Sequence, residues 1–192
     1  MVVVADCYNF RLSLWHLGDG TVWKHLGSEG TEPGQFTNIL AVAVTGAGAL
    51  AFTDWNRVQV LTVDGAVLCV LDPSAVVGVG RLGRYLCGVA LYPGTDEILV
   101  TDNFNHRMVA LSWSPEVCYY EQCCFPFSSC LVDVSAYLCF VCCIQNGLLD
   151  ARTFGSRGAQ LGQLNQPFGV AVTSKGDIWV ADTGNYRLAV LQ

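Results

Sequence analysis

The sequence has few basic residues. Among its 192 residues, 10 Lys and Arg stand against 16 Asp and Glu, giving a net charge of −6 and a pI near 4.8. The basic residues are scattered along the chain and form no run. Because an acidic surface repels the phosphate backbone, general affinity for nucleic acid is disfavoured, and RNA binding would require a local basic patch.

The motifs of common catalytic sites are also missing. The chain contains no Gly-x-Ser-x-Gly elbow, no phosphate-binding loop and no convincing nucleophile–base pair. It has only three histidines, at His16, His25 and His106. We therefore expect no catalytic residue, no bound metal and no cofactor.

An export signal is absent from the sequence as well. The N-terminal stretch MVVVADCYNFRL has no basic n-region and reaches Asp6 before any apolar segment of signal-peptide length. Outside residues 118–145 only Cys7, Cys69 and Cys87 remain, which are too few for a secreted disulfide framework. These features predict a cytoplasmic protein with no membrane association.

One pattern occurs three times along the chain. It reads VVVADCYNFRLSL at 2–14, ILVTDNFNHRMVAL at 98–111 and IWVADTGNYRLAVL at 178–191, and a shortened copy, LAFTDWNRVQVL, lies at 50–61. Each copy contains an apolar strand, an Asp, a short turn with Asn and Arg, and a second apolar strand. The marker aspartates are Asp6, Asp54, Asp102 and Asp182.

A second pattern precedes these strands. GSEGTEPGQFTNILAVAV at 27–44 and GSRGAQLGQLNQPFGVAV at 155–172 align without gaps and place a Val-Ala-Val strand before the Asp-bearing strand. A fourth strand fits in the segments that follow, at 21–27 and 66–72. Short strands repeating with a period in the 40s predict an all-β fold, a β-propeller whose blades are four-stranded antiparallel sheets.

The complete pattern, Gly-Val-Ala-Val followed by Ile-x-Val-x-Asp-x-x-Asn-x-Arg, resembles the NHL repeat, with residues 155–191 as the best match. The resemblance implies an NHL-type propeller over 1–192. Since about three units are present and the family implies six blades, we expect an incomplete ring. Three explanations are open: a fragment, an incomplete gene model, or a half that associates with a second copy to complete a ring.

The residues that recur in each turn are predicted to fasten the blades rather than to catalyse, because a catalytic group is needed once per site. The Asp is expected to accept hydrogen bonds from turn N–H groups and to pair with the Arg. These structural markers are Asp6, Asn9, Arg11, Asp54, Asp102, Asn105, Arg107, Asp182, Asn185 and Arg187.

Residues 114–145 interrupt the repeat with a Cys-rich apolar insertion. The marker spacing is 48, 48 and then 80 residues, and removal of 117–145 restores a plausible blade. A zinc site, a membrane segment and a natural loop insertion are open interpretations. We favour a fourth, a retained in-frame intron, because the stretch is rich in residues encoded by pyrimidine-rich codons.

The turns also carry aromatic and imidazole side chains, which predict a binding face. Equivalent turns project from one end of a propeller, and aromatic rings are favoured at protein-binding hot spots. The candidate binding residues are Tyr8, Phe10, Trp55, Phe104, His106 and Tyr186. An alternative for these rings is that they wedge between neighbouring blades.

The function that these observations predict is a non-catalytic interaction platform for a protein partner. Two alternatives stay open from the family resemblance. One is a metal-dependent propeller enzyme similar to the amidating lyases or lactonases, with histidines around a central ion. The other is an RNA-binding propeller of a parent that resembles the tripartite-motif ubiquitin ligases.

Overall fold

The computed structural model describes residues 1–71, 82–95, 97–113 and 148–191. The Cys-rich insertion predicted at 114–145 lies outside the described residues. The strands are β1 (Val2–Asp6), β2 (Arg11–Trp15), β3 (Val22–Leu26), β4 (Ile39–Val44), β5 (Leu50–Asp54), β6 (Arg57–Leu61), β7 (Val67–Leu71), β8 (Leu86–Leu91), β9 (Glu97–Asp102), β10 (Arg107–Trp113), β11 (Leu148–Phe154), β12 (Pro167–Val172), β13 (Ile178–Asp182) and β14 (Arg187–Leu191).

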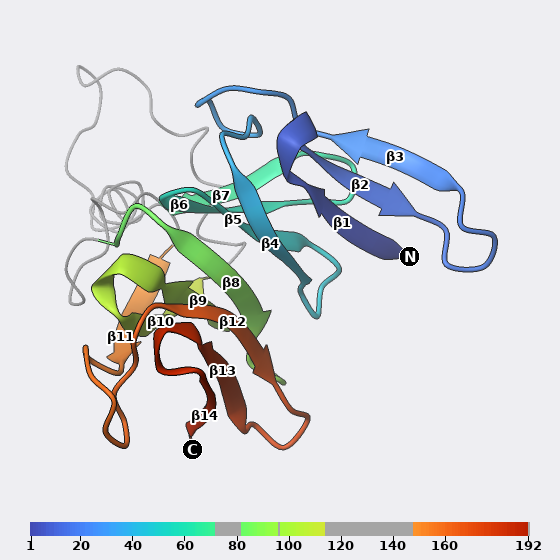
Figure 1. The fold of residues 1–192 in the computed structure, drawn as a ribbon. Helices are drawn as coiled ribbons and strands as arrows, with labels where there is room; N and C mark the ends of the chain where they lie inside the picture. The colour runs from blue at the N-terminus through green and yellow to red at the C-terminus, as the bar shows by residue number, and fades with distance from the viewer. Residues whose placement is uncertain (72–81, 96, 114–147, 192) are drawn as a thin grey trace, which may run out of the picture.

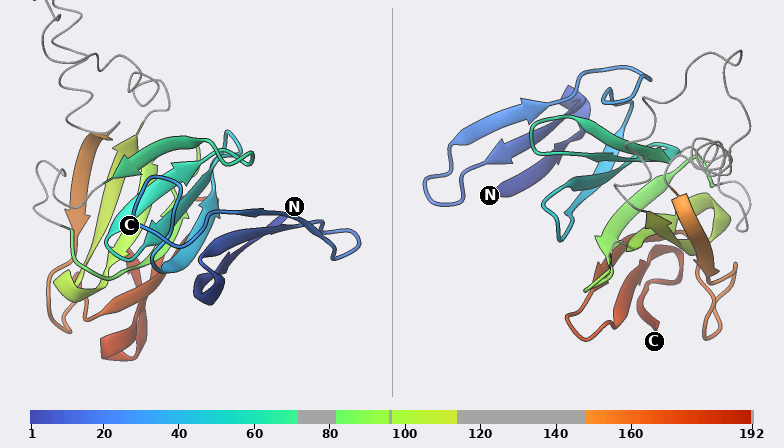
Figure 2. Two further views of the ribbon diagram at one scale, coloured as in Figure 1. Left: turned by 90° about the horizontal axis from the view of Figure 1, so that it is seen from above. Right: turned by 180° about the vertical axis from the view of Figure 1, so that it is seen from behind.

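These strands form four antiparallel sheets, which confirms the predicted all-β fold. In chain order they are blade 1 (β1-β2-β3), blade 2 (β4-β5-β6-β7), blade 3 (β8-β9-β10-β11) and blade 4 (β12-β13-β14). Blades 2 and 3 have the four strands that the repeat predicts, and blades 1 and 4 have three each in the described part of the chain. The four sheets follow one another in a curved row (Figures 1 and 2).

The marker turns, which join the Asp-bearing strand of each blade to the Arg-bearing strand, lie along one rim of the row. Three of them are short 3-10 turns, η1 (Cys7–Asn9), η2 (Asn103–Asn105) and η4 (Thr183–Asn185). Each ends in a residue with left-handed backbone, at Phe10, His106 and Tyr186. The described parts of the loops that connect one blade to the next lie along the same rim, because the antiparallel order returns the chain there.

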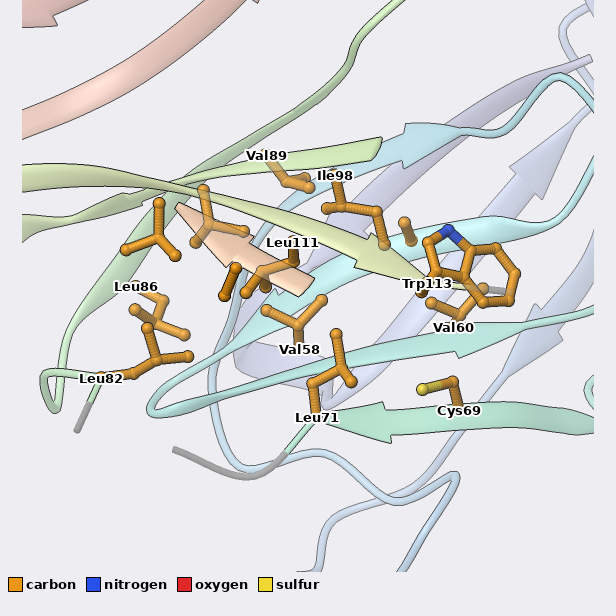
Figure 3. Packing of buried hydrophobic residues seen from close by; sticks show 14 of the residues in the cluster. Val58, Val60, Cys69, Leu71, Leu82, Leu86, Val89, Ile98, Leu111 and Trp113 are labelled. Atoms are coloured by element: carbon orange, nitrogen blue, oxygen red, sulfur yellow. The ribbon is translucent and has the colours of Figure 1, made fainter. Parts of the chain in front are cut away.

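Apolar side chains between neighbouring blades form the core. The inner blades are covered on both faces, so every residue of β5 is buried, whereas β14 in blade 4 alternates between half-buried and exposed residues. Figure 3 shows Val58 and Val60 of blade 2 packing against Ile98 and Leu111 of blade 3. Burial of such a side chain contributes about 1.5–3 kcal/mol, so each blade is stabilised mainly by its neighbours.

Hydrogen bonds between inner strands also join the blades. The Thr53 hydroxyl of β5 donates to the Cys87 carbonyl of β8 over 3.1 Å. One blade further on, the Thr101 hydroxyl of β9 donates to the Phe168 carbonyl over 2.7 Å and accepts the Gly88 N–H at 2.7 Å. The threonine that precedes the marker Asp therefore links blade 2 to blade 3 and blade 3 to blade 4.

Candidate functional site

The marker aspartate of blade 3 holds both its own turn and the loop that leads into the blade. Asp102 is fully buried. One carboxylate oxygen accepts the Gly83 N–H at 2.9 Å, and the other accepts the Asn105 amide and the Arg107 Nε–H, each at 2.9 Å. All the donors are protein groups, so the carboxylate is satisfied without a ligand.

Blade 4 repeats this arrangement. Asp182 is fully buried and accepts the Asn165 N–H at 2.6 Å, the Asn185 amide at 2.8 Å and the Arg187 Nε–H at 2.7 Å. The rest of the Arg187 guanidinium donates to backbone carbonyls of the loop 159–163. Burial acts to raise the pKa of Asp182, but the hydrogen bonds from Asn165, Asn185 and Arg187 outweigh it and hold the pKa below its usual value.

The shortened turn of blade 2 forms the same fastening with a different set of donors. Asp54 is fully buried and accepts the Arg57 Nε–H at 2.9 Å, with the N–H groups of Thr37 and Asn38 on its other oxygen. Because the turn is two residues shorter, Gln59 supplies the side-chain amide, 3.3 Å from the carboxylate. The sequence pattern did not identify Gln59 as part of the fastening.

In blade 1 the same pair is partly exposed to solvent. Asp6 accepts the Arg11 Nε–H at 2.9 Å and the Asn9 amide at 2.8 Å, and no connecting loop lies over it in the described residues. The hydrogen bond from Arg11 and then that from Asn9 lower the pKa of Asp6. This partly exposed pair provides a natural comparison for the pairs whose aspartate is fully buried.

The structure brings only part of the predicted ring residues together. Phe10 packs against the core between blades 1 and 2. The His106 ring accepts the Gln166 N–H at 3.1 Å, which places it at the junction between blades 3 and 4. Tyr8 and Tyr186 are 95% and 97% exposed.

Two of the ring residues meet through a third aromatic side chain. The rings of Trp55 and Tyr85 lie edge to face with centroids 5.6 Å apart, and the rings of Tyr85 and Phe104 are tilted at the same distance. Trp55 is 40% exposed and Phe104 is 58% exposed. We call Trp55, Tyr85 and Phe104 the aromatic strip, which spans blades 2 and 3 along the rim where the marker turns lie.

Backbone hydrogen bonds fix the aromatic strip in place. The Leu86 N–H donates to the Trp55 carbonyl over 2.9 Å, and the Asn103 N–H donates to the Tyr85 carbonyl over 3.1 Å. The sequence pattern missed Tyr85, because it lies in a connecting loop where blades 2 and 4 have Asn38 and Gln166. The sequence signal that could have identified Tyr85 is its position directly before β8, the first strand of blade 3.

The three histidines do not converge. His16 lies beside the Trp23 ring, His25 contacts the Ser13 hydroxyl through Nδ1 at 3.1 Å, and His106 belongs to another blade. Within residues 1–71, 82–95, 97–113 and 148–191, no group of three or more His, Cys, Asp or Glu side chains is placed to hold a metal ion. In the same ranges no helix has the length and apolarity needed to cross a membrane.

Cys87 is predicted to resist alkylation in the folded protein. Burial, followed by the negative charge of Asp102, raises the pKa of its thiol to about 12. The thiol therefore remains protonated and inaccessible at pH 8, where the thiolate is the reactive form. Peptide mapping after iodoacetamide treatment should show Cys87 unmodified in native protein and modified after denaturation. Modification at equal rates in both states would contradict the burial seen here.

Comparisons with known proteins agree with this fold. Residues 164–191 match the family model described as NHL repeat. Virginiamycin B lyase from Staphylococcus aureus is 12% identical with a TM-score of 0.55, covering 99% of this chain and 51% of its own. A streptogramin B lyase is 11% identical with a TM-score of 0.57, covering 98% of this chain and 49% of its own.

A chain of the mitotic checkpoint complex is 10% identical with a TM-score of 0.54, covering 95% of this chain and 44% of its own. The chain thus spans about half the length of the solved structures that it resembles. No curated protein matches its sequence. Identities this low show the fold and transfer no activity. Residues 164–191 therefore match the NHL repeat, and the described residues form blades of a β-propeller.

Proposed function

We propose that the chain is a non-catalytic binding module that holds a protein partner against the end of the propeller where the marker turns lie. The observation that carries this proposal is the aromatic strip, in which Trp55, Tyr85 and Phe104 present connected rings across two blades. The exposed rings of Tyr8 and Tyr186 extend the aromatic character of the equivalent turns to blades 1 and 4.

The physical properties of the aromatic strip suit protein recognition. Aromatic side chains offer a large contact area and lose little rotamer freedom on binding. Edge-to-face packing on Tyr85 and the backbone hydrogen bonds on both sides hold Trp55 and Phe104 before a partner arrives. A preorganised surface binds more tightly because less ordering is required.

The acidic chain favours a protein partner over RNA. With a net charge of −6, long-range electrostatics would repel a phosphate backbone. The marker carboxylates Asp54, Asp102 and Asp182 are occupied by internal hydrogen bonds, so they offer no free ligands for a catalytic metal. One of the similar structures is part of a protein assembly, the mitotic checkpoint complex, which supports this fold as a platform for protein contacts.

Peptide selection tests the proposal with a library in place of a natural partner. A displayed random peptide library is panned against the protein, and the affinity of enriched peptides is measured by calorimetry. Trp55→Ala and Phe104→Ala should each weaken binding about 30-fold, the effect of losing a hot-spot residue of about 2 kcal/mol. Trp23→Ala is the matched control, because Trp23 is similarly exposed on β3, away from the aromatic strip.

Two results would contradict the proposal. Enriched peptides that bind the two strip variants as tightly as the unchanged protein would place the contact elsewhere. Tight binding of a single-stranded RNA oligonucleotide, with affinity that falls steeply as salt is added, would favour the RNA alternative. Thermal unfolding of each variant shows whether a lost affinity reflects a lost contact or a lost fold.

A further inference from the structure

Among the described residues, each end of the row of blades leaves one apolar sheet face uncovered. On blade 4 we call this uncovered face the forward face. It carries Trp179, 41% exposed, and Leu188, 66% exposed, with Val190 opposite Trp179 in the strand register. It faces away from blade 3, because the alternate residues of the same strands form the packed core with that blade.

The forward face repeats positions that are buried inside the row. Counting from the marker Asp and Arg, Trp179 is equivalent to Leu99 of blade 3, and Leu188 is equivalent to Met108. Leu99 and Met108 are fully buried against blade 4. A blade at this repeat position is therefore built to be covered by a following blade.

Blade 1 carries the complementary uncovered face, which we call the rear face. Val2 and Val4 are exposed there, and Trp15 lies opposite both Val2 and Val22 in the strand register. The equivalents of Val2 and Val4 in blade 2 are Leu50 and Phe52, which are fully buried against blade 1.

The three blade junctions of this chain all join one forward face to one rear face. Leu12 and Leu14 of blade 1 meet Leu50 and Phe52 of blade 2 in this way. The chain forms this interface three times internally. The forward face of blade 4 and the rear face of blade 1 are the two complementary halves of the same interface, and each lacks a partner among the described residues. Exposed apolar faces of this kind are unusual on monomers and mark sites of association.

We propose that two copies of this chain associate head to tail, with the forward face of each copy packed on the rear face of the other. A second copy carries both complementary faces, and the solved propellers it resembles contain about twice its length, so two copies supply the length of one such chain. Reciprocal contacts of this type close into a symmetric pair. The association goes beyond the proposed function and leaves the aromatic strip free.

The mass of the protein in solution tests the proposal. Light scattering after size exclusion, at several concentrations and in a reducing buffer that prevents disulfides between copies, should give the mass of two chains. Leu188→Glu on the forward face and Val4→Glu on the rear face should each weaken the pair at least about 100-fold, because each buries a carboxylate without a partner.

A mixture of the two variants distinguishes a head-to-tail contact from other contacts. The Leu188→Glu copy keeps an intact rear face, and the Val4→Glu copy keeps an intact forward face. Mixed together, they should form a pair through one intact junction, although neither variant pairs alone. Leu161→Glu and Val44→Glu are matched controls at exposed positions outside the two end faces and should pair like the unchanged protein.

Several outcomes would overturn the proposal. A mass of one chain at every concentration would show that a second copy does not cover the end faces and would favour a different polypeptide as their partner. Loss of pairing in only one of the two variants would indicate a face that contacts itself, and a mixture of folded variants that stays monomeric would exclude the reciprocal contact. Circular dichroism of each variant establishes that it is folded. Pairing that survives both substitutions would place the contact on other residues.

Discussion

Replacing Asp54 with alanine is expected to destabilise the fold by about 3–5 kcal/mol, the cost of removing one partner of a buried ion pair. Asp54 accepts hydrogen bonds from Arg57 and from the N–H groups of Thr37 and Asn38. Without the carboxylate, the buried N–H groups and the half-buried guanidinium lose their acceptor in a place that water cannot reach easily. Chemical denaturation at one fixed protein concentration measures the loss of unfolding free energy.

Blade 1 offers the matched control for this experiment. Asp6 pairs with Arg11 through the same atoms and at the same 2.9 Å distance, but the pair is partly exposed and holds no connecting loop in the described part of the chain. Asp6→Ala should therefore change the unfolding free energy far less, because solvent reaches and screens the partly exposed pair and rehydrates Arg11. Equal losses in the two variants would show that the ion pair, and not its burial over a loop, determines the effect.

Replacing Gly88 with alanine is expected to cost about 3 kcal/mol, at the upper end of the range for overpacking. A Cβ atom at this position would lie 2.6 Å from the Phe168 carbonyl oxygen and 2.9 Å from the Val170 nitrogen. These obstructing atoms are backbone, so no side chain can rotate away. The added methyl group would push blade 4 away from blade 3.

Gly169 occupies the same repeat position in blade 4 and serves as the control. A Cβ atom there would have Ala181 Cβ as its nearest neighbour, at an ordinary 3.7 Å. Gly169→Ala should therefore be neutral or slightly stabilising, because alanine reduces the freedom of the unfolded chain. If both substitutions lowered the unfolding free energy equally, close packing between blades 3 and 4 could not be the cause.

The sequence predicted the blades well, because the repeat is local. The marker Asp ends β1, β5, β9 and β13, and the marker Arg begins the strand that follows in each blade. Asp-to-Arg spacing sets the turn, and the turn sets the register of both strands. The outer strands expected near 21–27 and 66–72 are β3 and β7.

The candidate site was harder to predict, because it depends on contacts between blades. Trp55 and Phe104 were identified as equivalent turn residues, but their connection through Tyr85 depends on a loop with no repeat pattern. The ring positions also have positive φ angles at Phe10, Trp55, His106 and Tyr186, where Asn or Gly would be the usual residue. A sequence pattern of aromatic residues does not indicate that these positions adopt positive φ angles.

The fastening of the connecting loop has an evolutionary consequence. In blade 2 the groups held by Asp54 and Arg57 all lie within residues 31–59, and in blade 4 the corresponding groups lie within 158–187. Each of these two fastenings is therefore contained in one short continuous stretch of the sequence. A tandem duplication of that piece would copy the loop together with the carboxylate and guanidinium that secure it, so a new blade would arrive already able to hold its own connection to the blade before it.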